Sequence, residues 1–206
     1  MCRIVLLPVV FILAIVTIAT AQQEKKHDPL YVSTGVGINK VQGALHKTFR
    51  SSVAFNSGFE KIFKNKWFVL LEAGFNTLRY DQQTRDENSN YLFQGTSSSL
   101  ITGSINAGRS FYFGQSRWFV SPYVGTGYIN IGKPRLQLHA PSGVITQHIV
   151  RKAGVLGRGG TRIGFNTKTK LLQTIYLDGS YWNTSIKIDE SSWRSISVFI
   201  GIKMAM

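Results

Sequence analysis

Apolar and polar residues alternate along most of the chain with a period of two. Residues 30–39 show the pattern well, because one set of side chains occupies the even positions and another the odd positions. The even set is mainly apolar: Leu30, Val32, Thr34, Val36 and Ile38. The odd set is mainly small or polar: Tyr31, Ser33, Gly35, Gly37 and Asn39. Successive side chains of a β-strand point to opposite faces, so this pattern predicts a strand and not a helix.

The same alternation returns along the rest of the chain. It is clear in residues 49–60, 67–76 and 195–204, and weaker in 97–113, 117–131, 148–166 and 170–186. Together these segments predict about eight strands. The connections alternate in length: short ones at 64–66, 114–116 and 167–169, and longer ones at 41–47, 81–90, 132–147 and 187–192. Short turns at one rim and long loops at the other are typical of a membrane β-barrel.

The two faces of the strands support a membrane barrel over a soluble one. One face is aliphatic and aromatic, and the other carries small, polar and charged residues suited to a narrow lumen. Aromatic residues also gather near both ends of the strands, which predicts two girdles at the membrane interfaces. The girdle near the short turns would contain Phe63, Trp67, Phe113, Trp118 and Phe165. The girdle near the long loops would contain Tyr80, Tyr91, Tyr128, Trp182 and Trp193. A soluble β-sandwich with core aromatics is the alternative.

With these features the chain resembles the small outer-membrane β-barrel superfamily of bacteria, which includes the eight-stranded OmpA-type transmembrane domain. The resemblance rests on pattern and covers residues 22–206. It implies an all-β, eight-stranded, antiparallel, up-and-down transmembrane barrel that is a monomer.

The first residues predict export. Arg3 precedes an apolar run from Ile4 to Ile18, and Ala19-Thr20-Ala21 follows. This order is typical of a signal peptide over residues 1–21, cleaved before Gln22. A periplasmic tail at 22–29 and the barrel at 30–206 would follow, in the outer membrane. A retained helical anchor is the alternative, although the run is shorter than the ~20 apolar residues of a membrane span. Cleavage would also remove Cys2, the only cysteine, and with it any disulfide.

The charge is strongly basic, with 24 Lys and Arg against 10 Asp and Glu and a net charge of +14. The basic residues do not form one block, so we expect no nucleic-acid partner. In an exported protein they favour lipid phosphates instead. Six of them are predicted at the loop side of the barrel, where they could meet lipopolysaccharide phosphates: Arg79, Arg85, Lys133, Arg135, Arg151 and Lys187. Scattered, solvated cations are the alternative.

Charged residues also fall on the inward-facing parity. They are Arg50, Glu60, Glu72, Lys152, Arg158, Arg162, Asp178 and Lys203. An eight-stranded barrel has a lumen that side chains can fill, and buried charges there must pair. We therefore predict an ionic plug containing Arg158, Asp178, Glu72, Arg162, Glu60 and Arg50. An ion path through the same charges is the alternative. Arg109 is the exception, because its parity places it on the lipid face.

A hairpin centred on Lys168 predicts one specific pair. In that register Arg158 faces Asp178 across neighbouring strands, and Glu72 could approach both from across the lumen. Directly opposed side chains lie close enough to bond.

No catalytic or cofactor motif stands out. The glycine-rich segment 154–160 lacks the ending of a phosphate-binding loop, and the four histidines (His27, His46, His139 and His148) have no metal-ligand spacing. We therefore expect no cofactor, no metal and no enzymatic activity. A structural or adhesive role would be carried by the loops at 81–90 and 132–147, with an unknown partner. A narrow channel is the first alternative. A lipid A-modifying enzyme using His46 or His148 with Ser51, Ser52 or Ser142 is the second.

Overall fold

The computed structural model describes residues 30–51, 53–83, 92, 94–139, 144–167, 169 and 171–206. The predicted signal peptide (1–21) and tail (22–29) lie outside these residues. Within them, no helix has both the length and the apolar character needed to cross a membrane.

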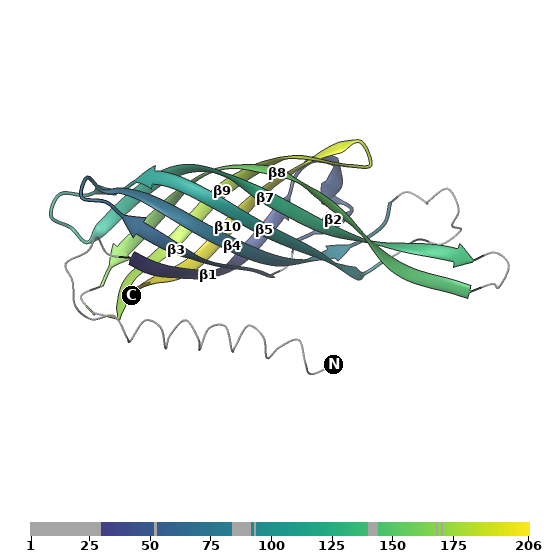
Figure 1. Ribbon diagram of the computed structural model, residues 1–206, viewed down its shortest axis with the longest axis horizontal. Helices are drawn as coiled ribbons and strands as arrows, with labels where there is room; N and C mark the ends of the chain where they lie inside the picture. The colour runs from purple at the N-terminus through teal and green to yellow at the C-terminus, as the bar shows by residue number, and fades with distance from the viewer. Residues whose placement is uncertain are drawn as a thin grey trace.

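Eight strands form the wall of a closed antiparallel barrel (Figure 1). They are β1 (Leu30–Val41), β3 (Val53–Ile62), β4 (Trp67–Tyr80), β5 (Thr96–Arg109), β7 (Trp118–His139), β8 (Val144–Asn166), β9 (Leu172–Ile188) and β10 (Ser191–Ala205). Each pairs with its neighbour along the chain, and β1 pairs with β10 to close the sheet. The predicted all-β, eight-stranded, up-and-down barrel is confirmed. Two short strands, β2 (Phe49–Arg50) and β6 (Phe111–Tyr112), pair with β4 and β7 at the rims.

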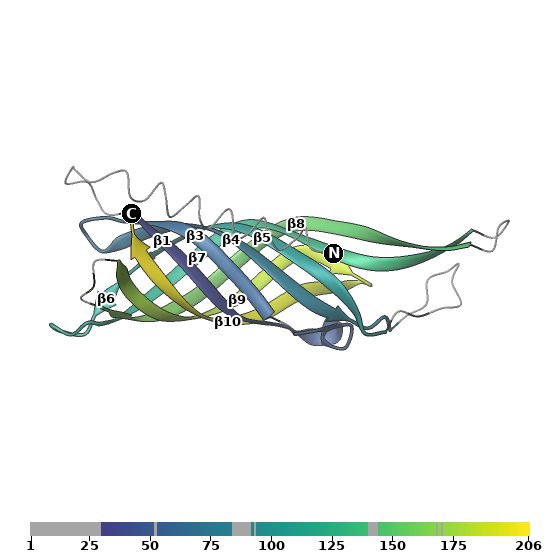
Figure 2. The same ribbon diagram turned by 90° about the horizontal axis from the view of Figure 1, so that it is seen from below.

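The strands cross the barrel obliquely, and both ends of the described chain lie at one rim (Figure 2). At that end Met206 N donates to the carbonyl of Leu30 over 3.0 Å. We call this end the tight-turn rim, because three pairs of strands are joined by short connections there: β3 and β4, β6 and β7, and β8 and β9. The opposite end, where β1 and β4 finish, is the loop rim.

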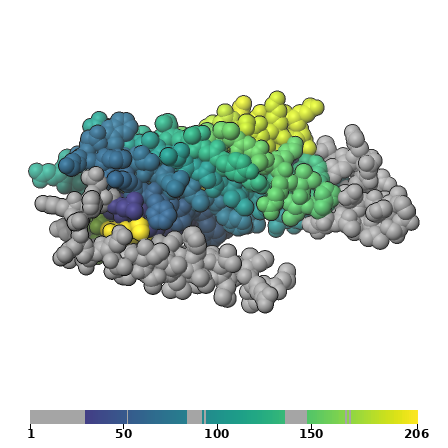
Figure 3. Space-filling model, viewed as in Figure 1, coloured from purple at the N-terminus to yellow at the C-terminus, as the bar shows by residue number. Residues whose placement is uncertain are grey.

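Burial follows the predicted parity. In β10, Ile196, Val198 and Ile200 are exposed on the outside, whereas Ser195 and Ser197 are buried inside. An apolar exterior and a polar interior are what a barrel surrounded by lipid requires. On the face visible in Figure 3, the side chains of adjacent strands pack into a continuous wall.

Only one aromatic girdle matches the prediction. Phe63, Trp67, Phe113 and Trp118 are exposed at the tight-turn rim. Of the residues predicted in the girdle near the long loops, Tyr128 is exposed, but Tyr80, Trp182 and Trp193 are buried in the lumen, so that part of the prediction is wrong. The reason is parity: Trp182 lies on the same face of its strand as Asp178, and Trp193 on the same face as Ser195. Tyr91 lies outside the described residues.

The longest predicted loop is mostly strand. Strand β7 continues to His139 and β8 begins at Val144, and the two pair along their full lengths. Strand β5 leaves β7 after the pair Leu100 and Ile131, and β9 leaves β8 beyond the pair Thr184 and Leu156. Residues 132–139 and 144–151 therefore form a two-stranded ribbon beyond the barrel wall (Figure 1), here called the projecting hairpin.

The other long connections are more ordered than predicted. The connection at 187–192 is a two-residue turn of Asp189 and Glu190, both with positive φ (47° and 66°). The connection at 41–47 contains a 3-10 helix, Gly43–His46. For the loop at 81–90, only residues 81–83 are described.

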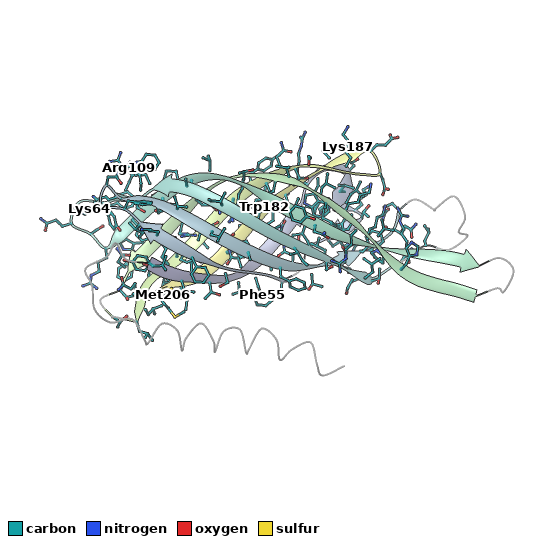
Figure 4. The ribbon with its side chains drawn as sticks, viewed as in Figure 1. Phe55, Lys64, Arg109, Trp182, Lys187 and Met206 are labelled. Atoms are coloured by element: carbon teal, nitrogen blue, oxygen red, sulfur yellow. The ribbon has the colours of Figure 1, made fainter. Side chains whose placement is uncertain are left out.

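Arg109 is at the end of β5, opposite Trp67 and at the tight-turn rim. Figure 4 shows it at the same end of the barrel as Lys64, far from Lys187. Its guanidinium carbon lies 5.5 Å from the centre of the Phe111 ring. A cation on the lipid-facing parity is tolerated here because it can reach the membrane interface.

Candidate functional site: the barrel lumen

Six charged side chains meet in the lumen, which we call the lumen ionic network: Glu60, Glu72, Arg158, Arg162, Asp178 and Lys203. Arg158 binds Glu72 and also lies 3.2 Å from Asp178 (Nη2 to Oδ1). Arg162 lies 2.6 Å from Glu60 (Nη1 to Oε2) and 3.4 Å from Asp178 (Nε to Oδ2). Lys203 binds the other oxygen of Glu60. Three acids thus balance three bases.

Uncharged side chains form further hydrogen bonds with the charged groups of the network. The Tyr123 hydroxyl donates to Asp178 over 2.7 Å, and the Asn56 amide donates to Glu72 over 3.3 Å. Arg158 Nε donates to the Ser180 hydroxyl over 3.1 Å. Buried charges are stable only when they are paired and hydrogen-bonded, and this network meets both conditions.

Aromatic rings enclose the cations of the network. The guanidinium carbon of Arg162 is 4.2 Å from the centre of the Tyr176 ring, and that of Arg158 is 5.4 Å from Trp182. Figure 4 places Trp182 in the middle of the barrel. The Lys203 ammonium lies 5.6 Å from Phe119, toward the tight-turn rim. The face of an aromatic ring attracts a cation, and these rings also occupy the space around the cations in the lumen.

The structure brings five of the six predicted plug residues together, namely Glu60, Glu72, Arg158, Arg162 and Asp178. The predicted placement of Arg50 in the plug is wrong. Its side chain is 62% exposed, and its Nε lies 3.1 Å from Asp81 Oδ2 at the loop rim. The strand breaks after Arg50, so the parity of β3 does not extend to it. Lys152 was also expected inside, but it is exposed, and its Nζ donates to the carbonyl of Lys187 over 2.9 Å.

The predicted register of β8 and β9 is wrong by four residues. Arg162 faces Asp178, and Arg158 faces Trp182. The connection between the strands is longer than Thr167–Thr169, because Thr167 N bonds to the carbonyl of Gln173. The contact between Arg158 and Asp178 still forms, because the long arginine side chain reaches the carboxylate diagonally.

A second plug fills the loop-rim end of the lumen, and the sequence analysis missed it. We call it the apolar plug, and its buried members include Val41, Leu45, Phe49, Leu78, Tyr80, Leu100, Ile129, Ile131, Leu156, Ile188 and Trp193. Leu45 comes from the 3-10 helix. Phe49 packs against Trp193 edge to face, with ring centres 5.0 Å apart. The signal was available, since Leu78, Leu100 and Leu156 share the inward parity of their strands.

The basic residues predicted at the loop rim differ in their exposure. Arg79, Arg151 and Lys187 are exposed. Lys133 is buried, and its Nζ lies 2.8 Å from Asp189 Oδ1; Arg135 lies 3.7 Å from the same oxygen. Both therefore lie at the loop rim, but each is paired with Asp189 at the base of the projecting hairpin. Arg85 lies outside the described residues.

A cavity of about 390 Å³ also opens at the loop rim. It is lined by Arg50, Arg79, Asp81, Gln82, Gln83, Gln94 and Gly95. Asp81 accepts both the Gly95 N–H, over 2.6 Å, and Arg50. The opposed pair Arg50 and Arg79 leaves the described lining with more positive than negative charge.

The histidines and serines of the enzymatic alternative are not brought together in the described part of the chain. His46 lies in the 3-10 helix and His148 in the projecting hairpin, and both are exposed, as is Ser51. Ser52 and Ser142 lie outside the described residues. Among those described, no three His, Cys, Asp or Glu side chains form a group that could hold a metal ion.

No protein-family model matches the sequence, and no curated protein matches it. Solved structures do match. A major outer membrane protein from Thermus thermophilus is 13% identical with a TM-score of 0.53, over 84% of this chain and 99% of that one. Neisserial surface protein A is 13% identical with a TM-score of 0.50, over 86% and 97%. Ail from Yersinia pestis is 16% identical with a TM-score of 0.47, over 87% and 100%. The chain has the fold of the eight-stranded outer-membrane β-barrels.

Proposed function

We propose that this protein is a non-enzymatic, monomeric scaffold in the outer membrane, with a closed lumen and a binding surface at its loop rim. One observation carries the proposal: two different layers fill the lumen in series. An ion entering from the loop rim would meet the apolar plug first and the balanced lumen ionic network next. A dry apolar layer opposes the entry of ions, and paired charges have no free site for a passing one.

The surface of the barrel supports a location in a membrane. The exposed exterior is rich in large apolar side chains, such as Phe55, Phe75 and Ile200, which water would not favour. Figure 4 shows Phe55 on the outside of the wall. Closure of the sheet pairs the wall strands with one another, which fits a protein that inserts alone. We expect the tight-turn rim to face the periplasm and the loop rim to face outward.

The loop rim offers the binding surface. The projecting hairpin extends beyond the wall, and Arg79, Arg151 and Lys187 are exposed near its base. We propose that these three cations contact lipopolysaccharide phosphates through charge-assisted hydrogen bonds, while the projecting hairpin carries a structural or adhesive contact to an unknown partner.

Conductance in planar bilayers tests the scaffold against the channel. The refolded protein should be electrically silent across a range of voltages, whereas steady unitary openings would contradict the proposal. The lipid contact is tested separately by lipopolysaccharide binding of Arg79→Gln/Arg151→Gln/Lys187→Gln. Weaker binding with a smaller salt dependence is expected, and unchanged binding would reject this part.

A further inference from the structure

Among the residues that the structure describes, the charged side chains exposed at the tight-turn rim are all basic. Its exposed cations are Lys61, Lys64, Lys66, Arg109 and Arg117. The described Asp and Glu side chains all lie elsewhere. Glu60, Glu72 and Asp178 are inside the lumen and paired, and Asp81, Asp189 and Glu190 lie at the loop rim. The cations of this rim therefore have no partner among the described Asp and Glu side chains.

Four of these cations lie beside aromatic rings. The distances from the charged group to the ring centre are 5.8 Å for Lys61 and Phe63, 5.1 Å for Lys66 and Tyr112, 5.5 Å for Arg109 and Phe111, and 5.9 Å for Arg117 and Phe165. Aromatic side chains at the end of a membrane strand sit at the level of the lipid headgroups. A cation held beside such a ring is therefore held at the depth of the lipid phosphates.

The cations follow the rim along one side of the barrel, from β3 to β7. Lys61 and Lys66 flank the turn between β3 and β4, Arg109 ends β5, and Arg117 precedes β7. Cations spread along a rim at one depth match a layer of phosphates better than they match one compact ligand. Each Lys or Arg near a membrane surface favours an anionic over a neutral surface by roughly fivefold at low salt.

We propose that the tight-turn rim binds the phosphate headgroups of anionic phospholipids and concentrates them in the lipid shell around that end of the barrel. This inference rests on the proposed function, because it requires that the barrel is embedded in a bilayer. It does not require the loop rim to bind anything, and it concerns the opposite leaflet.

The chain provides its own reporters for a test. Of the four tryptophans, Trp67 and Trp118 are 47% and 52% exposed at the tight-turn rim, while Trp182 and Trp193 are 3% and 0% exposed inside the lumen. The full protein would be refolded into vesicles of ordinary phosphatidylcholine. One series would contain increasing fractions of brominated phosphatidylglycerol and the other increasing fractions of brominated phosphatidylcholine, with the bromine on the acyl chains in both. Bromine quenches only nearby tryptophans, so quenching reports which lipid lies against the tight-turn rim.

We expect brominated phosphatidylglycerol to quench at severalfold lower fractions than brominated phosphatidylcholine, and the difference to shrink in 1 M salt. The variant Lys66→Gln/Arg109→Gln/Arg117→Gln removes three of the four cations that lie beside aromatic rings and should lose most of the preference. The matched control Lys40→Gln/Lys47→Gln/Arg194→Gln removes three exposed cations near the loop rim and should keep the preference.

The outcomes separate the two proposals. Equal quenching by both lipids in the unmodified protein, or a full preference in the first variant, overturns the anionic-lipid inference alone. The salt titration needs no variant, so it decides the question even if the triple substitution does not fold. Absence of quenching by either lipid, in protein that is folded, would instead overturn the membrane barrel itself.

Discussion

Arg162 lies directly opposite Asp178 on the neighbouring strand, and each of the two oxygens of that carboxylate serves a different arginine. Oδ2 lies 3.4 Å from Arg162 Nε, and Oδ1 lies 3.2 Å from Arg158 Nη2. Oδ1 also accepts the Tyr123 hydroxyl. Asp178 is therefore the acid that joins the two arginines, while Glu72 and Glu60 each bind one of them.

Replacing this joining acid should be costly. Asp178→Ala leaves two buried guanidiniums short of a partner, and we expect a loss of about 3–5 kcal/mol in the free energy of unfolding. Asp178→Asn keeps the shape of the side chain but not its charge. Its free energy of unfolding should lie between those of the unmodified protein and Asp178→Ala. The measurement is urea unfolding in bilayers, followed by tryptophan fluorescence. Asp81→Ala at the loop rim, with a partly exposed ion pair, should lose only about 1 kcal/mol. Equal losses for Asp81→Ala and Asp178→Ala would show that the lumen charges do not stabilise the barrel.

Two glycines of β8 should respond in opposite ways to the same substitution. A Cβ on Gly164 would collide with the Phe119 ring, whereas a Cβ on Gly159 would meet nothing within 4 Å. Gly164→Ala should therefore destabilise the barrel by about 1–3 kcal/mol through overpacking. Gly159→Ala should be neutral or slightly stabilising, since alanine loses less backbone entropy. The same unfolding assay compares them, and a neutral Gly164→Ala would contradict the packing of the Phe119 ring over Gly164, its partner on the neighbouring strand.

The apolar plug predicts a further matched pair. Leu45 enters it from the 3-10 helix and is 3% exposed, whereas Leu171 near the tight-turn rim is 77% exposed. Leu45→Ala should lose about 2–5 kcal/mol because it leaves a cavity, and Leu171→Ala should lose far less. Similar losses in urea unfolding would mean that Leu45 is not part of a packed core.

The base of the projecting hairpin should depend on Asp189. Both of its oxygens lie within hydrogen-bond reach of Lys133 Nζ, at 2.8 and 2.9 Å. Asp189→Asn retains a side chain that tolerates the positive φ, but removes the charge that Lys133 needs. We expect faster amide hydrogen exchange around Lys133 and its partner Val150. Glu190→Gln changes the other turn residue and should leave these amides as they are; similar changes in both variants would point to the turn and not to the ion pair.

The period of two was enough to predict the wall of the barrel and the inward placement of Glu60, Glu72, Arg158, Arg162 and Asp178. It could not predict the register of β8 against β9, because register depends on the length of the turn. The Thr, Lys and Leu residues between these two strands have no strong preference for one type of turn. The two-residue turn at Asp189 and Glu190 was missed for the same reason: it adopts positive φ without the usual Asn-Gly or Asp-Gly pair.

The projecting hairpin was missed for a different reason. Pro134 and Pro141 with nearby polar residues are typical of a loop, and proline is excluded from central strands. Pro134 nevertheless lies in β7, opposite Ile149 and beyond the point where β5 has left the sheet. Proline is tolerated on such an edge. A sequence pattern does not show where a central strand becomes an edge strand.

The pairing of the projecting hairpin limits how it can change during evolution. A true loop can gain or lose any number of residues, but here each residue of one strand has a partner on the other, up to His139 and Val144. A single inserted residue on one side would exchange the two faces of everything beyond it, or would have to be absorbed as a bulge. Surface diversity in this part of the molecule should therefore arise by substitution, or by lengthening both strands together, more readily than by single-residue insertions.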